Sequence, residues 1–118
     1  MPDKFTIYHN PRCSKSRQTL AILEQNGIDA EVVRYLETPP SATQIKQILK
    51  ALNIPARQLM RQKEAEYKDL NLADDTLTES QLIEAMVTTP KLIERPIVLK
   101  GSKAVLGRPP ENVLELIQ

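Results

Sequence analysis

The order of short strand and helix patterns restricts the fold of this chain more than any other feature of its sequence. Residues 5–8 predict a strand that places Phe5 and Ile7 on one face. The helix pattern that follows ends near Asn26-Gly27, a pair typical of a helix C-terminus, and residues 30–36, rich in Val and Tyr, predict a second strand. A strand, a helix and a strand at this spacing predict a right-handed βαβ unit with parallel strands.

Helix signals dominate the middle of the chain. Ser41-Ala42-Thr43-Gln44 and Thr78-Glu79-Ser80-Gln81 have the form of capping boxes, and each precedes apolar residues at helical spacing. The charged residues 62–75 between them predict a solvated turn of helix and a loop rather than a site. Pro90 ends the last helix of this segment. We therefore expect a helical block at about residues 41–90.

Two further strand patterns follow the helical block. Ile97-Val98-Leu99 and Ala104-Val105-Leu106 flank a turn and predict a β-hairpin, and a last helix follows. A βαβ unit, a helical block and a ββα unit in this order predict an α/β fold of the thioredoxin-like type, with a mixed four-stranded sheet and a single domain over residues 1–118. That plan keeps a cis peptide bond before its third strand, which predicts one at Arg95-Pro96.

Composition limits the classes of function open to the chain. Its 118 residues carry a net charge of +1, which gives no reason to expect nucleic acid or an anionic membrane as a direct partner. The single cysteine excludes an internal disulfide and a thiolate-rich metal site, and we expect no bound metal. No apolar run approaches the length of a transmembrane helix, and Met1-Pro2-Asp3-Lys4 leads into the first strand without a secretory signal. We therefore expect a cytoplasmic protein.

That single cysteine, Cys13, falls in the loop between the first strand and the first helix. The turn signal Asn10-Pro11 precedes it, so we expect the sulfur at or near a helix N-terminus, where free N–H groups and the helix dipole favour an anion. The cations Arg12, Lys15 and Arg17 lie beside it in the sequence. A lone cysteine is often an inert buried residue. The polar and cationic neighbours favour the other interpretation, a nucleophilic cysteine with a lowered pKa.

Three arginines outside the loop occupy positions where such a fold presents site residues. Arg61 lies in the helical block, Arg95 before the third strand and Arg108 after the fourth. Singly, each is most often a surface cation paired with a carboxylate. Together with Cys13 they predict a site for a tetrahedral oxyanion, because guanidinium groups offer paired donors to its oxygens.

Five motifs in order carry a family resemblance that spans nearly the whole chain. They are His9-Asn10-Pro11-x-Cys13-x-x-Ser16-Arg17, Tyr35-Leu36-Glu37-x-Pro39-Pro40, Leu59-Met60-Arg61, Arg95-Pro96-Ile97-Val98 and Arg108-Pro109. The sequence resembles the glutaredoxin-coupled arsenate reductases, the ArsC family. The resemblance implies that Cys13 is the nucleophile and that Arg61, Arg95 and Arg108 hold the oxyanion. It assigns supporting places to His9, Asn10, Ser16, Arg17 and Pro96. For His9 it leaves open whether the imidazole tunes Cys13 or is structural.

The resemblance also implies a reaction. An arsenate reductase of this kind holds no cofactor and uses glutathione as an external reductant, with a glutaredoxin as partner. Reduction of arsenate to arsenite takes two electrons, and this chain has one sulfhydryl, so at least one thiol must be external. The chain departs from the family at Arg12 and Lys15, where many members carry small or neutral residues. It also lacks the C-terminal tail of the best-known enzymes, so substrate preference stays open.

Two alternatives from other classes remain. The first is a regulator similar to the Spx proteins, which resemble the ArsC family, bind RNA polymerase and sense oxidation through a Cys-x-x-Cys pair. In this chain Ser16 occupies the second cysteine position of that pair, so the redox switch cannot form. A thiol-redox carrier of the glutaredoxin type is the other alternative. Arsenate binding favours the reductase, and co-purification with RNA polymerase favours the regulator.

Overall fold

The computed structural model describes residues 4–117. Met1-Pro2-Asp3, the beginning of the segment in which we expect no secretory signal, and Gln118 lie outside this range. Two compact units make up the described chain, one of residues 4–38 and 95–117 and the other of residues 39–94. Within the described range, no helix combines the length and the apolar content that crossing a membrane requires.

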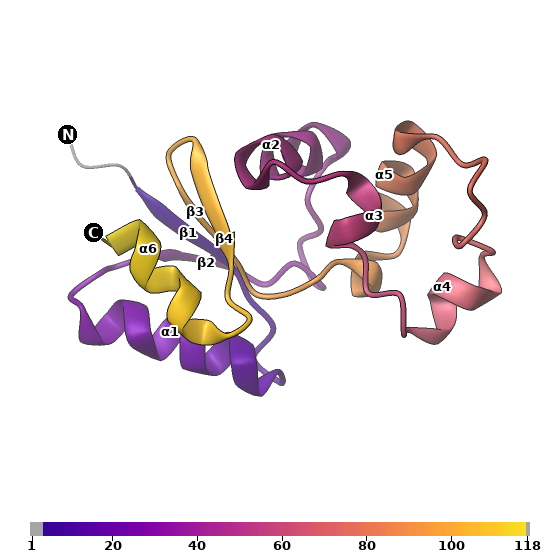
Figure 1. Cartoon of the computed structure of the whole chain (residues 1–118). Helices are drawn as coiled ribbons and strands as arrows, with labels where there is room; N and C mark the ends of the chain where they lie inside the picture. The colour runs from indigo at the N-terminus through magenta and orange to yellow at the C-terminus, as the bar shows by residue number, and fades with distance from the viewer. Residues whose placement is uncertain (1–3, 118) are drawn as a thin grey trace. The chain divides into compact units, whose positions relative to one another are not determined.

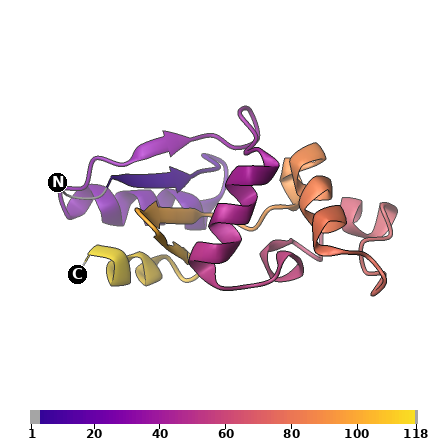
Figure 2. The same ribbon diagram turned by 90° about the horizontal axis from the view of Figure 1, so that it is seen from above.

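A mixed four-stranded sheet forms the centre of the first unit. The strands are β1 (Phe5–Tyr8), β2 (Glu31–Val33), β3 (Ile97–Lys100) and β4 (Lys103–Leu106). Their order across the sheet is β2-β1-β3-β4 (Figure 1, Figure 2). Strand β1 runs parallel to β2 and antiparallel to β3, and β3 and β4 form the predicted hairpin. The predicted βαβ unit and the thioredoxin-like fold are therefore confirmed.

Helix α1 (Ser14–Gln25) connects β1 to β2 and ends where the sequence predicts. Gly27 has a φ of 73°, a left-handed conformation that glycine adopts without strain. Its N–H donates to the carbonyl of Glu24 at 3.0 Å, and the N–H of Ile28 donates to the carbonyl of Leu23 at 2.9 Å. These two bonds satisfy carbonyls that the end of the helix would otherwise leave unpaired.

The C-terminal segment completes the core of this unit. It begins as a 3-10 helix, η2 (Pro110–Val113), and continues as α6 (Leu114–Ile117). Side chains of β1, β3, α1, η2 and α6 share one buried cluster, formed by Phe5, Ile7, Leu23, Val98, Val113 and Leu116. Helices α1 and α6 therefore cover the same face of the sheet. This packing leaves the loop before α1 at one end of the strands, where Cys13 lies.

The second unit is helical. Its elements are α2 (Ala42–Leu52), α3 (Ala56–Leu59), α4 (Ala65–Asp69), α5 (Glu79–Thr88) and the 3-10 helix η1 (Pro90–Leu92). Helix α5 contacts α2, α3 and η1. Both predicted capping boxes are confirmed: in each, the N-cap hydroxyl accepts an N–H and the glutamine amide oxygen accepts the N-cap N–H, as Ser41 and Gln44 show at 3.2 and 2.9 Å.

The second strand is shorter than the predicted range of 30–36. Strand β2 ends at Val33, whose carbonyl accepts the His9 N–H at 2.8 Å. Strand β1 itself ends at Tyr8, which is the partner of Val33, so the residues after Val33 have no β1 residue to pair with. The N–H groups of Glu37 and Thr38 instead both donate to the carbonyl of Arg34 at 2.9 Å and close a turn.

The charged segment 62–75 is also less solvated than predicted. It contains the short helix α4, and it buries Tyr67 and Leu72. The Arg57 guanidinium organises this segment by donating to the Tyr67 hydroxyl at 2.7 Å, to the Leu72 carbonyl and to the Asp74 carbonyl at 3.0 Å. The predicted turn of helix and loop are present and most of their residues are exposed, but the burial of Tyr67 and Leu72 was not predicted, because it depends on this partner from α3.

Candidate active site

Cys13 directly precedes α1 and occupies its N-cap position. Its N–H donates to the Asn10 carbonyl at 3.0 Å, and its carbonyl accepts the Arg17 N–H at 3.0 Å. The side-chain oxygen of Asn10 accepts the Arg12 N–H at 3.0 Å and shapes the turn before the cysteine. The half-buried thiol thus lies where the first turn of the helix exposes unpaired N–H groups.

A buried serine fixes this loop to the helix. Ser16 is fully buried, and its oxygen accepts the Asn10 N–H at 3.0 Å and lies 2.6 Å from Nδ1 of the buried His9. Burial lowers the pKa of His9, and the charges of Arg34 and Arg17 lower it further, so the imidazole is neutral at pH 7. In this state the Ser16 hydroxyl can donate to Nδ1 while it accepts from Asn10.

The pKa of Cys13 lies below its ordinary value, the direction that the sequence predicts. Burial of the sulfur raises the pKa, but the other influences outweigh it. They are the Ser16 N–H, the charge and the hydrogen bond of Arg95, and the Lys15 N–H, all of which stabilise the thiolate. Helix geometry and one arginine together therefore favour a nucleophilic sulfur.

The cation that acts on the sulfur differs from those that the loop sequence indicates. Arg12, Lys15 and Arg17 are exposed, where water screens their charges, and the Arg17 guanidinium donates to the Pro11 carbonyl at 2.8 Å. Arg95 instead reaches Cys13 from a position 82 residues further along the chain (95 minus 13). The expectation that neighbours in sequence lower this pKa through their charges is therefore wrong in its choice of residues.

We predict a Cys13 alkylation midpoint below the ordinary thiol pKa of about 8.5, measured as iodoacetamide rate against pH. Arg95→Gln should shift this midpoint upward, because it removes the charge and the charged donor that stabilise the thiolate. Arg12→Gln, an exposed cation next to the cysteine, is the matched control and should shift it little. A wild-type midpoint at or above the ordinary value would contradict the prediction.

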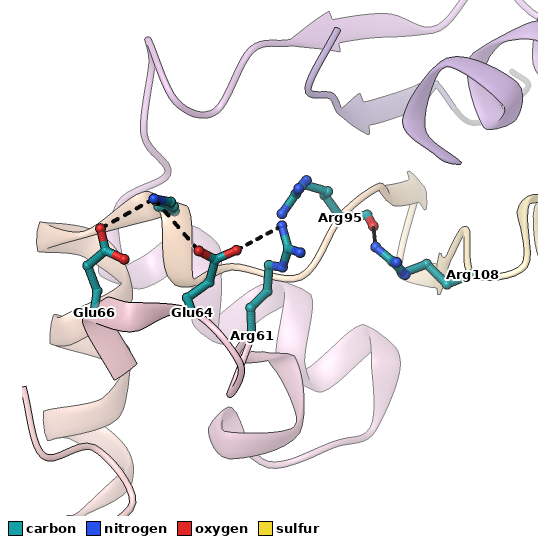
Figure 3. A network of polar contacts seen from close by, with 6 residues as sticks. Arg61, Glu64, Glu66, Arg95 and Arg108 are labelled. Atoms are coloured by element: carbon teal, nitrogen blue, oxygen red, sulfur yellow. Dashed lines mark hydrogen bonds and ion pairs between the residues drawn. The ribbon is translucent and has the colours of Figure 1, made fainter. Parts of the chain in front are cut away.

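Arg95 and Arg108 lie together at the same end of the first unit. Arg95 precedes β3 and Arg108 follows β4, and Nη1 of Arg108 donates to the Arg95 carbonyl at 3.2 Å (Figure 3). The Arg95-Pro96 peptide bond is cis, as predicted, and Arg108-Pro109 is a second cis bond that the sequence did not indicate. The structure therefore brings Cys13, Arg95 and Arg108 into one cluster.

Gly107 sets the spacing within this cluster. Its N–H donates to the Pro96 carbonyl at 2.9 Å, so the residues next to Arg95 and Arg108 are joined directly. A methyl group on Gly107 would collide with the Thr19 hydroxyl and lie 2.7 Å from Cγ of Pro96. Thr19 is fully buried in α1 and donates to the Lys15 carbonyl at 2.8 Å. Only glycine allows the chain directly after β4 to approach α1 this closely.

Gly107→Ala should therefore destabilise the protein by about 1–3 kcal/mol, the usual cost of overpacking a filled core. Urea unfolding would measure the change. Thr19→Ala removes one of the colliding side chains, so the double variant should lose less stability than the two single losses added together. A Gly107→Ala variant as stable as the wild type would contradict the close approach.

Arg61, the third predicted arginine, belongs to the second unit. Its side chain is 23% exposed, and its Nη1 lies 3.3 Å from Oε1 of Glu64. Glu64 also lies near Lys91, which in turn pairs with Glu66 (Figure 3). Within residues 4–117, no group of three or more His, Cys, Asp or Glu side chains is placed to hold a metal ion.

Comparison with known proteins identifies the family. The sequence model of the ArsC family matches residues 8–116 of this chain. The chain belongs to the ArsC family. Relatives similar to this chain include the "Uncharacterized protein YfgD" of Escherichia coli K12, 58% identical over 118 residues and 99% of both chains. An "Arsenate reductase" of Neisseria meningitidis serogroup A is 49% identical over 114 residues, which cover 96% of this chain and 97% of the relative.

A solved structure of a similar protein agrees with the fold. The "Arsenate reductase from Vibrio cholerae" superposes with a TM-score of 0.94, is 51% identical and covers 98% of both chains. The shared fold includes the sheet and the helical block that carry the predicted site residues.

The sequence did not indicate two residues that shape the cluster of Cys13, Arg95 and Arg108. Thr19 is a buried polar residue one turn after Ser16, on the face of α1 that the pattern assigns to the core. Gly107 precedes Arg108 and marks a close approach of the backbone to α1. A small residue next to a predicted site arginine was the only local signal, since the packing partner of Gly107 is distant in sequence.

Proposed function

We propose that this chain is an arsenate reductase in which Cys13 is the nucleophile. The observation that carries the proposal is the lowered pKa of Cys13 at the N-terminus of α1, beside Arg95, in a chain of the ArsC family. Relatives named arsenate reductase at 49% identity support the choice of substrate. Arg95 and Arg108 supply guanidinium donors for the oxyanion, and the motif Leu59-Met60-Arg61 supports Arg61 as a third.

The proposed reaction begins with attack of the Cys13 thiolate on arsenic. A sulfur–arsenic bond forms, the bond from arsenic to one arsenate hydroxyl group breaks, and that hydroxyl takes up a proton and leaves as water. The arginines balance the negative charge of the remaining oxygens. Arsenic is still pentavalent in this adduct, so no electron has yet been transferred.

An external thiol completes the reduction. Its sulfur attacks Cys13, the sulfur–arsenic bond breaks, and arsenic keeps the electron pair and leaves as arsenite. The two sulfurs are oxidised to a mixed disulfide at Cys13, which a glutaredoxin clears by thiol exchange. We propose glutathione as this thiol, because the resemblance to glutaredoxin-coupled enzymes names it. We also propose the cytoplasm as the compartment, since a free catalytic cysteine requires reducing surroundings.

The test is arsenate reduction with glutathione, glutaredoxin, glutathione reductase and NADPH. Oxidation of NADPH and formation of arsenite should both require the protein and arsenate, and phosphate in place of arsenate should give neither. Omitting glutaredoxin should slow turnover because the mixed disulfide accumulates, and mass spectrometry should then detect glutathione on Cys13. Arsenite formation no faster than in the mixture without the protein would overturn the proposal.

A further inference from the structure

Arg61 lies in a chain of four alternating charges within the second unit (Figure 3). Glu64 connects Arg61 to Lys91: its Oε1 lies 3.3 Å from Nη1 of Arg61 and its Oε2 lies 3.7 Å from Nζ of Lys91. Lys91 also lies 3.5 Å from Oε2 of Glu66. Arg61 and Glu64 are the less exposed members, with side chains 23% and 19% exposed, whereas the side chain of Lys91 is 56% exposed.

The backbone around this ion pair is held firmly. The Arg61 N–H donates to the Leu92 carbonyl at 2.7 Å, and the neighbouring Met60 forms a β-bridge with Ile93. The Glu64 N–H donates to the Arg61 carbonyl at 3.2 Å, and the Glu64 carbonyl accepts the first hydrogen bond of α4. The backbone thus fixes the positions from which the two side chains reach each other, and the Arg61 guanidinium pairs with the Glu64 carboxylate.

We infer that Glu64 is a positioning residue that orients the Arg61 guanidinium for the oxyanion. The inference rests on the proposed function of Arg61. A long arginine side chain loses much rotational freedom when it is held in one geometry. If Glu64 has already ordered it, an arriving oxyanion does not bear that entropic cost. Without Glu64, the same ordering would weaken substrate binding.

A purely electrostatic effect of Glu64 predicts the opposite change in substrate binding when Glu64 is replaced. The four side chains sum to zero, so a neutral residue at position 64 adds one positive charge near Arg61, and a purely electrostatic role would strengthen anion binding. Glu66→Gln produces the same change in net charge and touches Lys91 but not Arg61. It is therefore the matched control for Glu64→Gln. The double variant Glu64→Gln with Lys91→Met restores the net charge to zero while Arg61 still lacks its partner.

The experiment measures arsenate KM and kcat for these variants and for Arg61→Ala. Glu64→Gln and the charge-neutral double variant should each raise KM about three- to tenfold, with kcat changed less than about twofold, as expected for the loss of one partly buried ion pair. Glu66→Gln should leave KM unchanged or lower it. An unchanged or lower KM in both variants at position 64 would overturn the inference, provided that Arg61→Ala raises KM.

A second readout does not depend on turnover. Nitrogen relaxation of the Arg61 Nε–H group in the intact protein reports how well the guanidinium is ordered. The group should be more mobile in both variants at position 64 than in the wild type and in Glu66→Gln. Equal order in all four proteins would overturn the inference. Absence of arsenate reduction by the wild type would instead count against the proposed function, and the relaxation data would still decide whether Glu64 orients Arg61.

Discussion

Cys13→Ser should abolish arsenate reduction, with a loss of at least about a thousandfold in kcat/KM, because a serine hydroxyl is not ionised at neutral pH and is a far weaker nucleophile than a thiolate. The variant should keep its fold. Cys13 occupies the N-cap position of α1, where serine is among the most favourable residues, so the helix should be at least as stable as before. The measurements are arsenite formation and thermal unfolding. Turnover by Cys13→Ser at a rate near that of the wild type would refute the proposed nucleophile.

Without added thiol, the number of arsenite molecules that the wild-type protein can form is limited by its cysteine content. The chain contains one sulfhydryl, so two electrons require the cysteines of two copies. At most one arsenite for every two chains should therefore form without glutathione. Ser14→Ala, which removes an exposed hydroxyl next to Cys13, is the control for Cys13→Ser and should keep most of the activity when glutathione is present. Repeated turnover without an external thiol would contradict the mechanism.

Arg95→Lys should lower kcat/KM for arsenate by about a hundredfold or more, the usual effect of losing a preorganised donor at a reacting oxyanion. Lysine keeps the positive charge but lacks the planar fork that can serve the sulfur and an oxyanion at the same time. Arg95 acts on the Cys13 thiolate through both its charge and a hydrogen bond, so the substitution should affect the nucleophile as well as the substrate.

The control for this substitution is Arg12→Lys, the same change at an exposed cation next to the cysteine. It should leave kcat/KM within about twofold, as expected for a solvated surface charge. Arg108→Lys should also weaken turnover, because that guanidinium holds the Arg95 carbonyl. If Arg95→Lys kept the activity of the wild type, the cluster of Cys13, Arg95 and Arg108 would have a structural role only.

Local signals in the sequence were sufficient for most of the fold. Both capping boxes, the helix end at Gly27 and the hairpin of β3 and β4 depend on residues close in the chain. These elements can therefore be predicted without a structure, because hydroxyl caps, a left-handed glycine and alternating apolar residues each stabilise them within a few positions of the chain. The order of these elements then leaves few topologies, and the thioredoxin-like arrangement is one of them.

The length of a strand and the burial of a loop residue could be established only from the tertiary structure. The valine-rich pattern at residues 30–36 predicts a longer strand than β2, because a pattern cannot tell where the neighbouring strand stops. The burial of Tyr67 and Leu72 likewise depends on Arg57, which the sequence places in another helix.

The sequence by itself therefore determined the order of the elements and the cysteine at a helix N-terminus, and it indicated Arg61, Arg95 and Arg108 as candidate site residues. Only the tertiary structure decided which groups act on that cysteine. It showed that Arg95, and not the charges of the cations adjacent to Cys13 in sequence, lowers the pKa of Cys13. It also showed the close approach of Gly107 to Thr19. The physical reason is that secondary structure follows from short-range preferences, whereas a pKa and a packed contact depend on groups that meet only after the chain has folded.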